Sequence, residues 1–480
     1  MSLGDAAAVR EQLGHPVVDI DGHTIEYFPV LDGYLREEGV DPSSPALRRM
    51  LPGAFGPPAS WHALSGDQRA ARRVARPPWW GAPMRNTRDL ATAMFPRLLH
   101  ERLDELGIDF GVVYPSLGLN LMHIGDDDVR RGACRALNRA NADAFAPYRD
   151  RLAPVAAIPM VTPAEAVDAI EHAVTELGFR AVLLQGYVQR PVGALAGRDG
   201  ELSQYATWLD MYGIDSAYDY DPVWAACVRL GVPVSFHSGS IGWGSRLSVS
   251  NYMYNHIGHL AEGHHALCKS LFLGGVTRRF PELRFAFLEG GVSWAASLYA
   301  ELIGHWEKRN LAALGNYDPG HLDRAEFGRL MAEYAPDWLQ IAQKARVGLG
   351  GAPEDPATLD EWAACEIEKA EDIRDLFVPN FFFGCEADDP LTTTAFNTRV
   401  NPFGARLHAM FGSDIAHWDV PDMAGVLCEA WELVEDGLVS EADFRDFVFA
   451  NPVRFFGGPG SRFFEGTAIE GDVAALADAG

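Results

Sequence analysis

Short apolar runs recur along this chain, each ending in glycine, proline or a polar residue, and stretches with helical spacing separate them. This alternation is typical of βα units. Several runs lack the polar alternation of a half-exposed strand, as expected for parallel strands buried on both faces. Eight runs predict an α/β fold, a distorted (β/α)8 TIM barrel. They lie at 17–23, 110–116, 152–160, 181–186, 232–239, 283–291, 381–388 and 407–418.

The intervals between the runs predict one domain over 1–480 rather than several. Residues 163–177 have apolar positions at helical spacing and fit the helix between the third and fourth strands. Two intervals are too long for one helix. We interpret 24–107, after the first strand, and 300–380, after the sixth, as long helical insertions over the barrel mouth or at a subunit contact. We expect an irregular tail over 457–480.

The net charge and the spacing of the cysteines argue against several classes of function. The 480 residues carry a net charge of −26, which repels nucleic acid and anionic membranes. The six cysteines are scattered without a CxxC pair, so neither a zinc knuckle nor a redox dithiol is expected. Because no secretory leader or apolar run of about eighteen residues is present, we expect a cytoplasmic protein. GxSxG, GxGxxG, P-loop and HExxH motifs are also absent.

Polar side chains at three strand ends predict a metal site. The first run ends in Asp21-Gly22-His23, and because alternate residues of a strand point the same way, Asp21 and His23 can share a face. His237 ends the fifth run and Asp414 the eighth. In a barrel these strand ends meet, so Asp21, His23, His237 and Asp414 form a four-ligand set for a divalent cation.

With these residues the chain resembles the amidohydrolase superfamily. More narrowly, it resembles the amidohydrolase-2 branch, which includes aminocarboxymuconate semialdehyde decarboxylase and aromatic-acid decarboxylases. The resemblance runs from residue 17 to about 456, through VVDIDGHTIE, VPVSFHSG, RRFPELRFAFLEGGVSW, FFFGCEADD and FGSDIAHWD. It implies a single divalent metal held by Asp21, His23, His237 and Asp414. The fourth strand has no lysine to form a bridging carbamate, which disfavours a binuclear centre.

The first ligand pair here is DxH, where the branch often has HxH. Two carboxylates formally cancel the charge of the metal, so bound water should be acidified less than in an all-imidazole zinc site. Oxygen ligands shift the preference toward Mn²⁺. We expect one divalent ion. Zn²⁺ stays favoured, and the oxygen ligands make Mn²⁺ the alternative.

The resemblance also suggests residues for chemistry and binding. Glu289 stands where the branch commonly has an acid/base histidine, so we predict that it transfers a proton or, as an alternative, orients a ligand histidine. Asp414 and His417 are further catalytic candidates. Arg246 could reach a substrate carboxylate, and Trp243 could line a pocket for a ring.

The leading function is decarboxylation of a small cyclic or aromatic carboxylic acid by a mononuclear metal enzyme. One alternative keeps the metal and hydrolyses an amide, lactone or carbon–carbon bond. A second alternative is a barrel subunit without catalysis. The expected partner is a small-molecule carboxylate, without nucleic acid or membrane, and the resemblance suggests a homodimer.

Overall fold

The computed structural model describes residues 6–50, 59–77, 84–116, 118–195, 206–238, 246–338, 341 and 358–479. Parallel strands form its centre, and all eight predicted strands are present in the predicted order, the third as two short strands. They are β1 (Val18–Thr24), β2 (Phe110–Pro115), β3 (Leu152–Pro154), β4 (Ala156–Ile158), β5 (Val182–Leu184), β8 (Val234–Phe236), β9 (Phe285–Phe287), β10 (Phe381–Glu386) and β11 (His408–Gly412).

The strands form two parallel sheets that meet at both edges. One has the order β1-β2-β3 and the other β11-β10-β9-β8-β5-β4. Only Val155 separates β3 from β4, and its N–H donates to the Val113 carbonyl at 3.1 Å. At the opposite edges the Asp414 N–H donates to the Asp21 carbonyl at 2.9 Å, just beyond β11. The result is a TIM-barrel-like α/β fold whose strand ends face a common centre.

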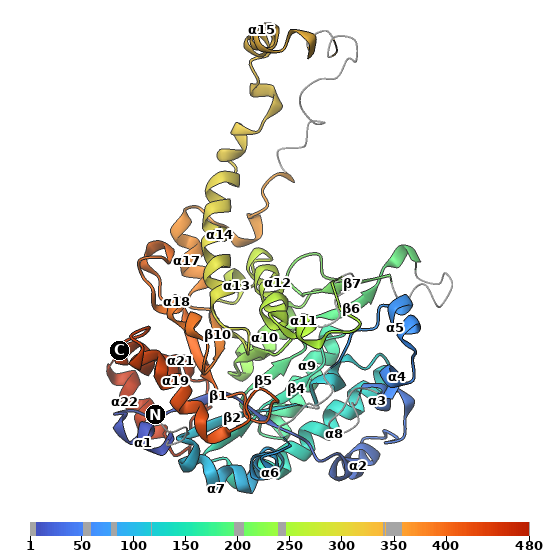
Figure 1. The fold of residues 1–480 in the computed structure, drawn as a ribbon, viewed down its shortest axis with the longest axis vertical. Helices are drawn as coiled ribbons and strands as arrows, with labels where there is room; N and C mark the ends of the chain where they lie inside the picture. Colours follow the sequence, from blue (N-terminus) through green and yellow to red (C-terminus); the bar gives the residue numbers. More distant parts are fainter. Residues whose placement is uncertain are drawn as a thin grey trace.

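Helices surround the strands and begin and end at residues suited to these positions (Figure 1). The Asp126 side chain caps the helix after β2, and Thr162 caps the helix after β4 by accepting from the Glu165 N–H at 3.2 Å. Gly231 ends the helix before β8 with φ +64°, which favours glycine. These helices are α8 (Asp127–Phe145), α9 (Pro163–Glu171), α10 (Asp221–Leu230), α12 (His259–Leu273), α14 (Ser293–Arg309), α17 (Ala370–Phe377), α19 (Val426–Glu435) and α21 (Asn451–Phe456).

The interval after β1 is helical and packs on the body. Its helix α2 lies against α8, where the Tyr34 hydroxyl donates to Asp143 at 2.9 Å. Near the strand ends, the Arg76 N–H donates to the Ser248 carbonyl at 2.9 Å. Its helices are α2 (Phe28–Glu37), α3 (Pro45–Met50), α4 (Ala59–His62), α5 (Gly66–Arg72), α6 (Thr87–Met94) and α7 (Pro96–Leu106).

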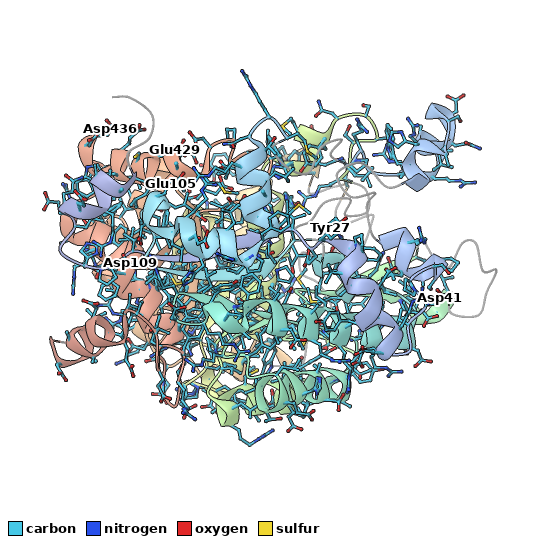
Figure 2. The ribbon with its side chains drawn as sticks, turned by 90° about the horizontal axis from the view of Figure 1, so that it is seen from below. Tyr27, Asp41, Glu105, Asp109, Glu429 and Asp436 are labelled. Atoms are coloured by element: carbon cyan, nitrogen blue, oxygen red, sulfur yellow. The ribbon has the colours of Figure 1, made fainter. Side chains whose placement is uncertain are left out.

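The interval after β9 projects from the body. Figure 1 shows α14 rising away from the strands and α15 (Arg324–Tyr334) at the far end of this projection. The described part of this interval therefore does not cover the strand ends. Figure 2 views the body from below, with Glu105 and Glu429 on one side and Tyr27 and Asp41 of the β1 interval on the other.

Two features differ from the sequence expectation. The tail is irregular only to residue 469, because 470–479 form helix α22 (Glu470–Ala479) and Phe463, Phe464 and Ile469 are buried beneath it. An antiparallel hairpin of β6 (Val188–Pro191) and β7 (Thr207–Asp210) follows β5 and was not predicted. Its strands have few apolar residues, so periodicity does not reveal them. No described helix combines the length and apolar character needed to span a bilayer.

We expect His408 to make the fold sensitive to acid. Burial lowers the pKa of its ring, which lies 4.4 Å from the Phe382 ring, to about 3. The unfolded chain takes up this proton below the ordinary pKa of about 6.5, so the free energy of unfolding should decrease as pH falls from about 6.5 toward 3. Urea unfolding at several pH values measures this slope. His408→Phe should flatten it and exposed His321→Gln should not; an unchanged slope in His408→Phe would contradict the assignment.

Candidate metal centre and active site

The four predicted metal ligands meet at the ends of their strands. Asp21 and His23 lie on β1, His237 directly follows β8, and Asp414 follows β11. All four side chains are almost fully buried, with exposed fractions of 0–4%. Four side chains from three distant parts of the sequence therefore share one enclosed volume.

The distances between ligand atoms suit a small cation. His23 Nε2 lies 3.1 Å from His237 Nε2 and 3.2 Å from Asp414 Oδ1. Asp21 Oδ1 lies 3.5 Å from His23 Nε2 and 3.6 Å from His237 Nε2. Zinc ligands at about 2.0–2.2 Å in tetrahedral geometry are separated by about 3.3–3.6 Å. Asp21, His23 and His237 thus lie close enough to hold one divalent ion, and Asp414 adjoins them through His23.

Two carboxylate oxygens in this group point to the same conclusion. Asp21 Oδ1 and Asp414 Oδ1 are buried, and within the described part of the chain neither makes a hydrogen bond of good geometry, although ring nitrogens of the cluster histidines lie close to both. A buried acceptor without a donor is costly, and a cation satisfies such oxygens. Two overlapping groups could therefore hold a metal, one of Asp21, His23 and His237 and the other of His23, Glu289, Asp414 and His417.

Asp19 fastens the first strand to the last. Its Oδ1 accepts from the Ser413 N–H at 2.9 Å and from the Asp21 N–H at 3.1 Å, and its Oδ2 accepts from the Ser413 hydroxyl at 2.6 Å. A Cβ on Gly22 would lie 2.9 Å from this Oδ2, so the middle position of DGH requires glycine. Asp19 is thus a buried residue whose hydrogen bonds hold the two strand ends together.

Glu289 and His417 join the cluster from its open side. Glu289 Oε2 lies 3.1 Å from His237 Nε2, the nitrogen that faces the other ligands. Glu289 therefore does not contact the far nitrogen of His237, where an orienting acceptor would lie. His417 Nδ1 lies 2.6 Å from Asp414 Oδ1 and 3.9 Å from Glu289 Oε1. Both residues are placed for proton transfer or direct ligation.

The backbone is strained at two of these positions. Glu289 has φ +58° and Asp414 has φ +46°. These values lie in the left-handed backbone region, which residues other than glycine rarely adopt. Such residues cost about 1–3 kcal/mol and persist where surrounding contacts enforce them, often at functional sites. Here the strain turns each carboxylate from its strand end toward the centre.

The buried carboxylates of the cluster need positive charge nearby to stay ionised, and this need is visible in the pKa values of their neighbours. Burial opposes ionisation of Asp414, but His417 and His23 outweigh it and hold the pKa of Asp414 below its usual range. Burial likewise opposes charge on His23, yet the carboxylates of Asp21 and Asp414 close to its ring raise its pKa well above the usual value. Either an imidazolium or a metal ion can supply the charge that these carboxylates require.

A cavity of about 1260 Å³ opens in front of the cluster, with His237, Glu289 and His417 in its wall. Aromatic side chains form much of the remaining wall and suit the faces of a ring compound. They include Tyr187, Trp208, Tyr218, Tyr252 and Trp418.

The two predicted substrate-binding residues have different outcomes. Arg246 forms an ion pair with Glu262 of α12, and its guanidinium is largely exposed. It does not belong to the described wall of the cavity, so its contact with substrate stays a prediction. Trp243 lies outside the described residues.

Several residues of the site were not singled out by sequence reasoning. His256 and His259 belong to the cavity wall, as do His123 and Gln185. Glu386 ends β10 near the cluster, and burial together with repulsion from Glu289 raises its pKa to about 9. The FFFGCEADD motif contains this residue, so its position at a strand end was the signal that could have identified it.

Comparisons with known proteins place the chain in a family. The amidohydrolase family model matches residues 95–458, so the chain belongs to the amidohydrolase family of enzymes. The decarboxylase orsB of Emericella nidulans is 29% identical over 167 residues, 32% of this chain and 42% of that protein. The chain thus matches less than half the length of this curated relative.

Solved structures show the same fold. An amidohydrolase from Mycobacterium avium subsp. paratuberculosis K-10 has a TM-score of 0.53 at 18% identity, covering 93% of this chain and 99% of that one. A 2,6-dihydroxybenzoate decarboxylase from Rhizobium has a TM-score of 0.49 at 16% identity, covering 92% and 99%. The similarity to the Mycobacterium amidohydrolase supports the fold expected from the family resemblance along most of the chain.

Metal binding should stabilise the protein. After chelation and dialysis, added Zn²⁺ or Mn²⁺ should raise the melting temperature, since a ligand at about a thousand times its dissociation constant adds about 4 kcal/mol. His23→Ala should lose this shift, because its Nε2 is within 3.5 Å of both aspartates. Arg246→Ala is the matched control and should keep the shift. A full metal-dependent shift in His23→Ala would contradict the site.

Proposed function

We propose that this chain is a mononuclear metal-dependent decarboxylase acting on a small cyclic or aromatic carboxylic acid. The observation that carries the proposal is the buried group of Asp21, His23, His237 and Asp414, with carboxylate oxygens that face imidazole nitrogens at 3.2–3.6 Å, at the wall of an aromatic-lined cavity. The eight strands would act as one distorted barrel that holds these ligands. The family membership and the partial match to a fungal decarboxylase support the same class of reaction.

We propose Zn²⁺ as the resident ion, with Mn²⁺ as the alternative. Two imidazoles and two carboxylates suit either ion, and Glu289 adds further oxygen character on the open side. A bound divalent ion would supply Lewis acidity toward the substrate carboxylate and an adjacent hydroxyl or carbonyl oxygen.

The protein's own residues would carry the remaining chemistry. Aromatic side chains of the cavity would orient the ring, so that the carbon bearing the carboxylate faces Glu289 and His417. When the bond to CO2 breaks, its electron pair stays on the ring carbon, which must then receive a proton. Asp414 raises the pKa of His417 despite burial, so His417 holds a proton close to Glu289 for this transfer.

Loss of a ligand should abolish the reaction. His237→Ala and Asp414→Asn should each lower kcat/KM by more than about a hundredfold, because even residues behind a metal ligand contribute 10–100-fold. Turnover is followed as CO2 released from a panel of aromatic acids, with metal content measured in parallel. Asp388→Asn, an exposed acid near Glu386, is the control. Normal turnover in either ligand variant with metal content unchanged would refute the scheme.

Glu289→Gln separates proton transfer from metal binding. The substitution keeps the shape but removes the ionisable group, so we expect kcat to fall about 10²–10⁴-fold while metal content is retained. Labelled water identifies the reaction: CO2 release with solvent hydrogen entering the product supports decarboxylation. Incorporation of solvent oxygen without CO2 would instead establish the hydrolase alternative.

We also propose that the chain is a homodimer. The projecting segment carries exposed apolar side chains, Phe327, Leu330 and Tyr334 on α15 and Trp338 and Ile341 after it, from 37% to 75% exposed. A second copy could cover these side chains. Light scattering should then give twice the chain mass, and Tyr334→Glu with Trp338→Glu should halve it. A wild-type monomer, or a dimer that survives both substitutions, would contradict this interface.

A further inference from the structure

A histidine of the cavity wall that is not part of the metal cluster is fixed in one tautomer by its neighbour. His123 ends the 3-10 helix that follows β2, and Gln185 directly follows β5. Gln185 Oε1 accepts from the Met160 backbone N–H at 3.1 Å. Because a backbone N–H can only donate, the other end of this amide must be its NH2 group.

The orientation of Gln185 determines the proton on His123. The Gln185 Nε2 atom lies 3.1 Å from His123 Nδ1, so this ring nitrogen is the acceptor. Burial lowers the pKa of His123 to about 4, and the ring is therefore neutral near pH 7. A neutral imidazole carries one proton, which must then be on Nε2.

His123 has a hydrogen-bond donor left for a bound molecule, whereas the nearby arginines already pair with acidic side chains. His123, Arg130 and Arg190 all belong to the wall of the large cavity. Arg130 Nε donates to Glu165 at 2.9 Å, and Arg190 pairs with the buried Asp210. Within the described part of the chain, the bond from Gln185 is the one hydrogen bond of His123. The Nε2–H is thus a donor left for a ligand.

His123 and Gln185 follow strands that lie beside those of the metal cluster, since β2 pairs with β1 and β5 pairs with β8. The cluster uses the ends of β1, β8, β9 and β11, whereas His123 and Gln185 follow β2 and β5. Tyr187, whose ring lies 5.3 Å from the His123 ring, extends the aromatic wall at this side. A ring bound with its carboxylate at the cluster would present another part of itself here.

We propose that His123, held by Gln185 as the Nε2–H tautomer, donates a hydrogen bond to a second oxygen of the substrate. This makes it a specificity-determining residue that favours ring carboxylates bearing a further oxygen acceptor, such as a second carboxylate or a carbonyl. The inference rests on the proposed function, because it takes the cluster as the site of the first carboxylate.

The test measures binding rather than turnover. Benzoate and the three benzenedicarboxylate isomers are titrated by calorimetry into the Zn²⁺-loaded protein. At least one isomer should bind about tenfold more tightly than benzoate, the effect of one hydrogen bond to a charged acceptor. His123→Leu should remove this preference. His123→Gln, which places an NH2 group where Nε2 lies, should retain it.

A spectroscopic measurement checks the positioning by Gln185. In protein labelled with ¹⁵N-histidine, the resonance lost in His123→Gln should show the neutral Nε2–H tautomer, and the preferred isomer should shift its Nε2 signal. An Nδ1–H tautomer, equal binding of all four probes, or an unchanged preference in His123→Leu would overturn the inference. Because none of these readouts requires CO2 release, an inactive enzyme would count against the proposed reaction alone.

Discussion

The junction between the first and last strands is the contact on which the site depends. Asp19 accepts three hydrogen bonds, two of them from Ser413, and the backbones of Asp21 and Asp414 are joined at 2.9 Å. Close approach is possible because Gly412 has no side chain: a Cβ there would lie 2.9 Å from the Cβ of Asp21. This junction brings together carboxylates almost four hundred residues apart, and the cation site exists only while it holds.

Electrostatics explains why this arrangement calls for a cation. Asp21, Asp414 and Glu289 lie buried together with the imidazoles of His23, His237 and His417. Buried carboxylates without balancing charge are unfavourable, so the cluster must recruit protons or a metal. The strained backbone at Glu289 and Asp414 adds a cost that core packing alone does not require. Both costs are accounted for if the strand ends are arranged for ion binding and chemistry.

The sequence predicted the parts of the molecule that depend on local pattern. Near-continuous apolar runs identified all eight strands, and DGH with two strand-end residues identified the group that the structure brings together. The β6–β7 hairpin was missed because its strands are polar, and α22 because its composition resembles a frayed end. The pairing of Arg246 with Glu262 and of His123 with Gln185 depends on loop geometry, which periodicity does not encode.

X-ray absorption at the edge of the bound metal tests the central claim most directly. The account predicts about one ion per chain, with two imidazole nitrogens and carboxylate oxygens at about 2.0–2.2 Å, and loss of an imidazole contribution in His23→Ala. A purified protein that takes up no divalent ion, or whose metal spectrum is unchanged by substitution of both His23 and His237, would contradict it.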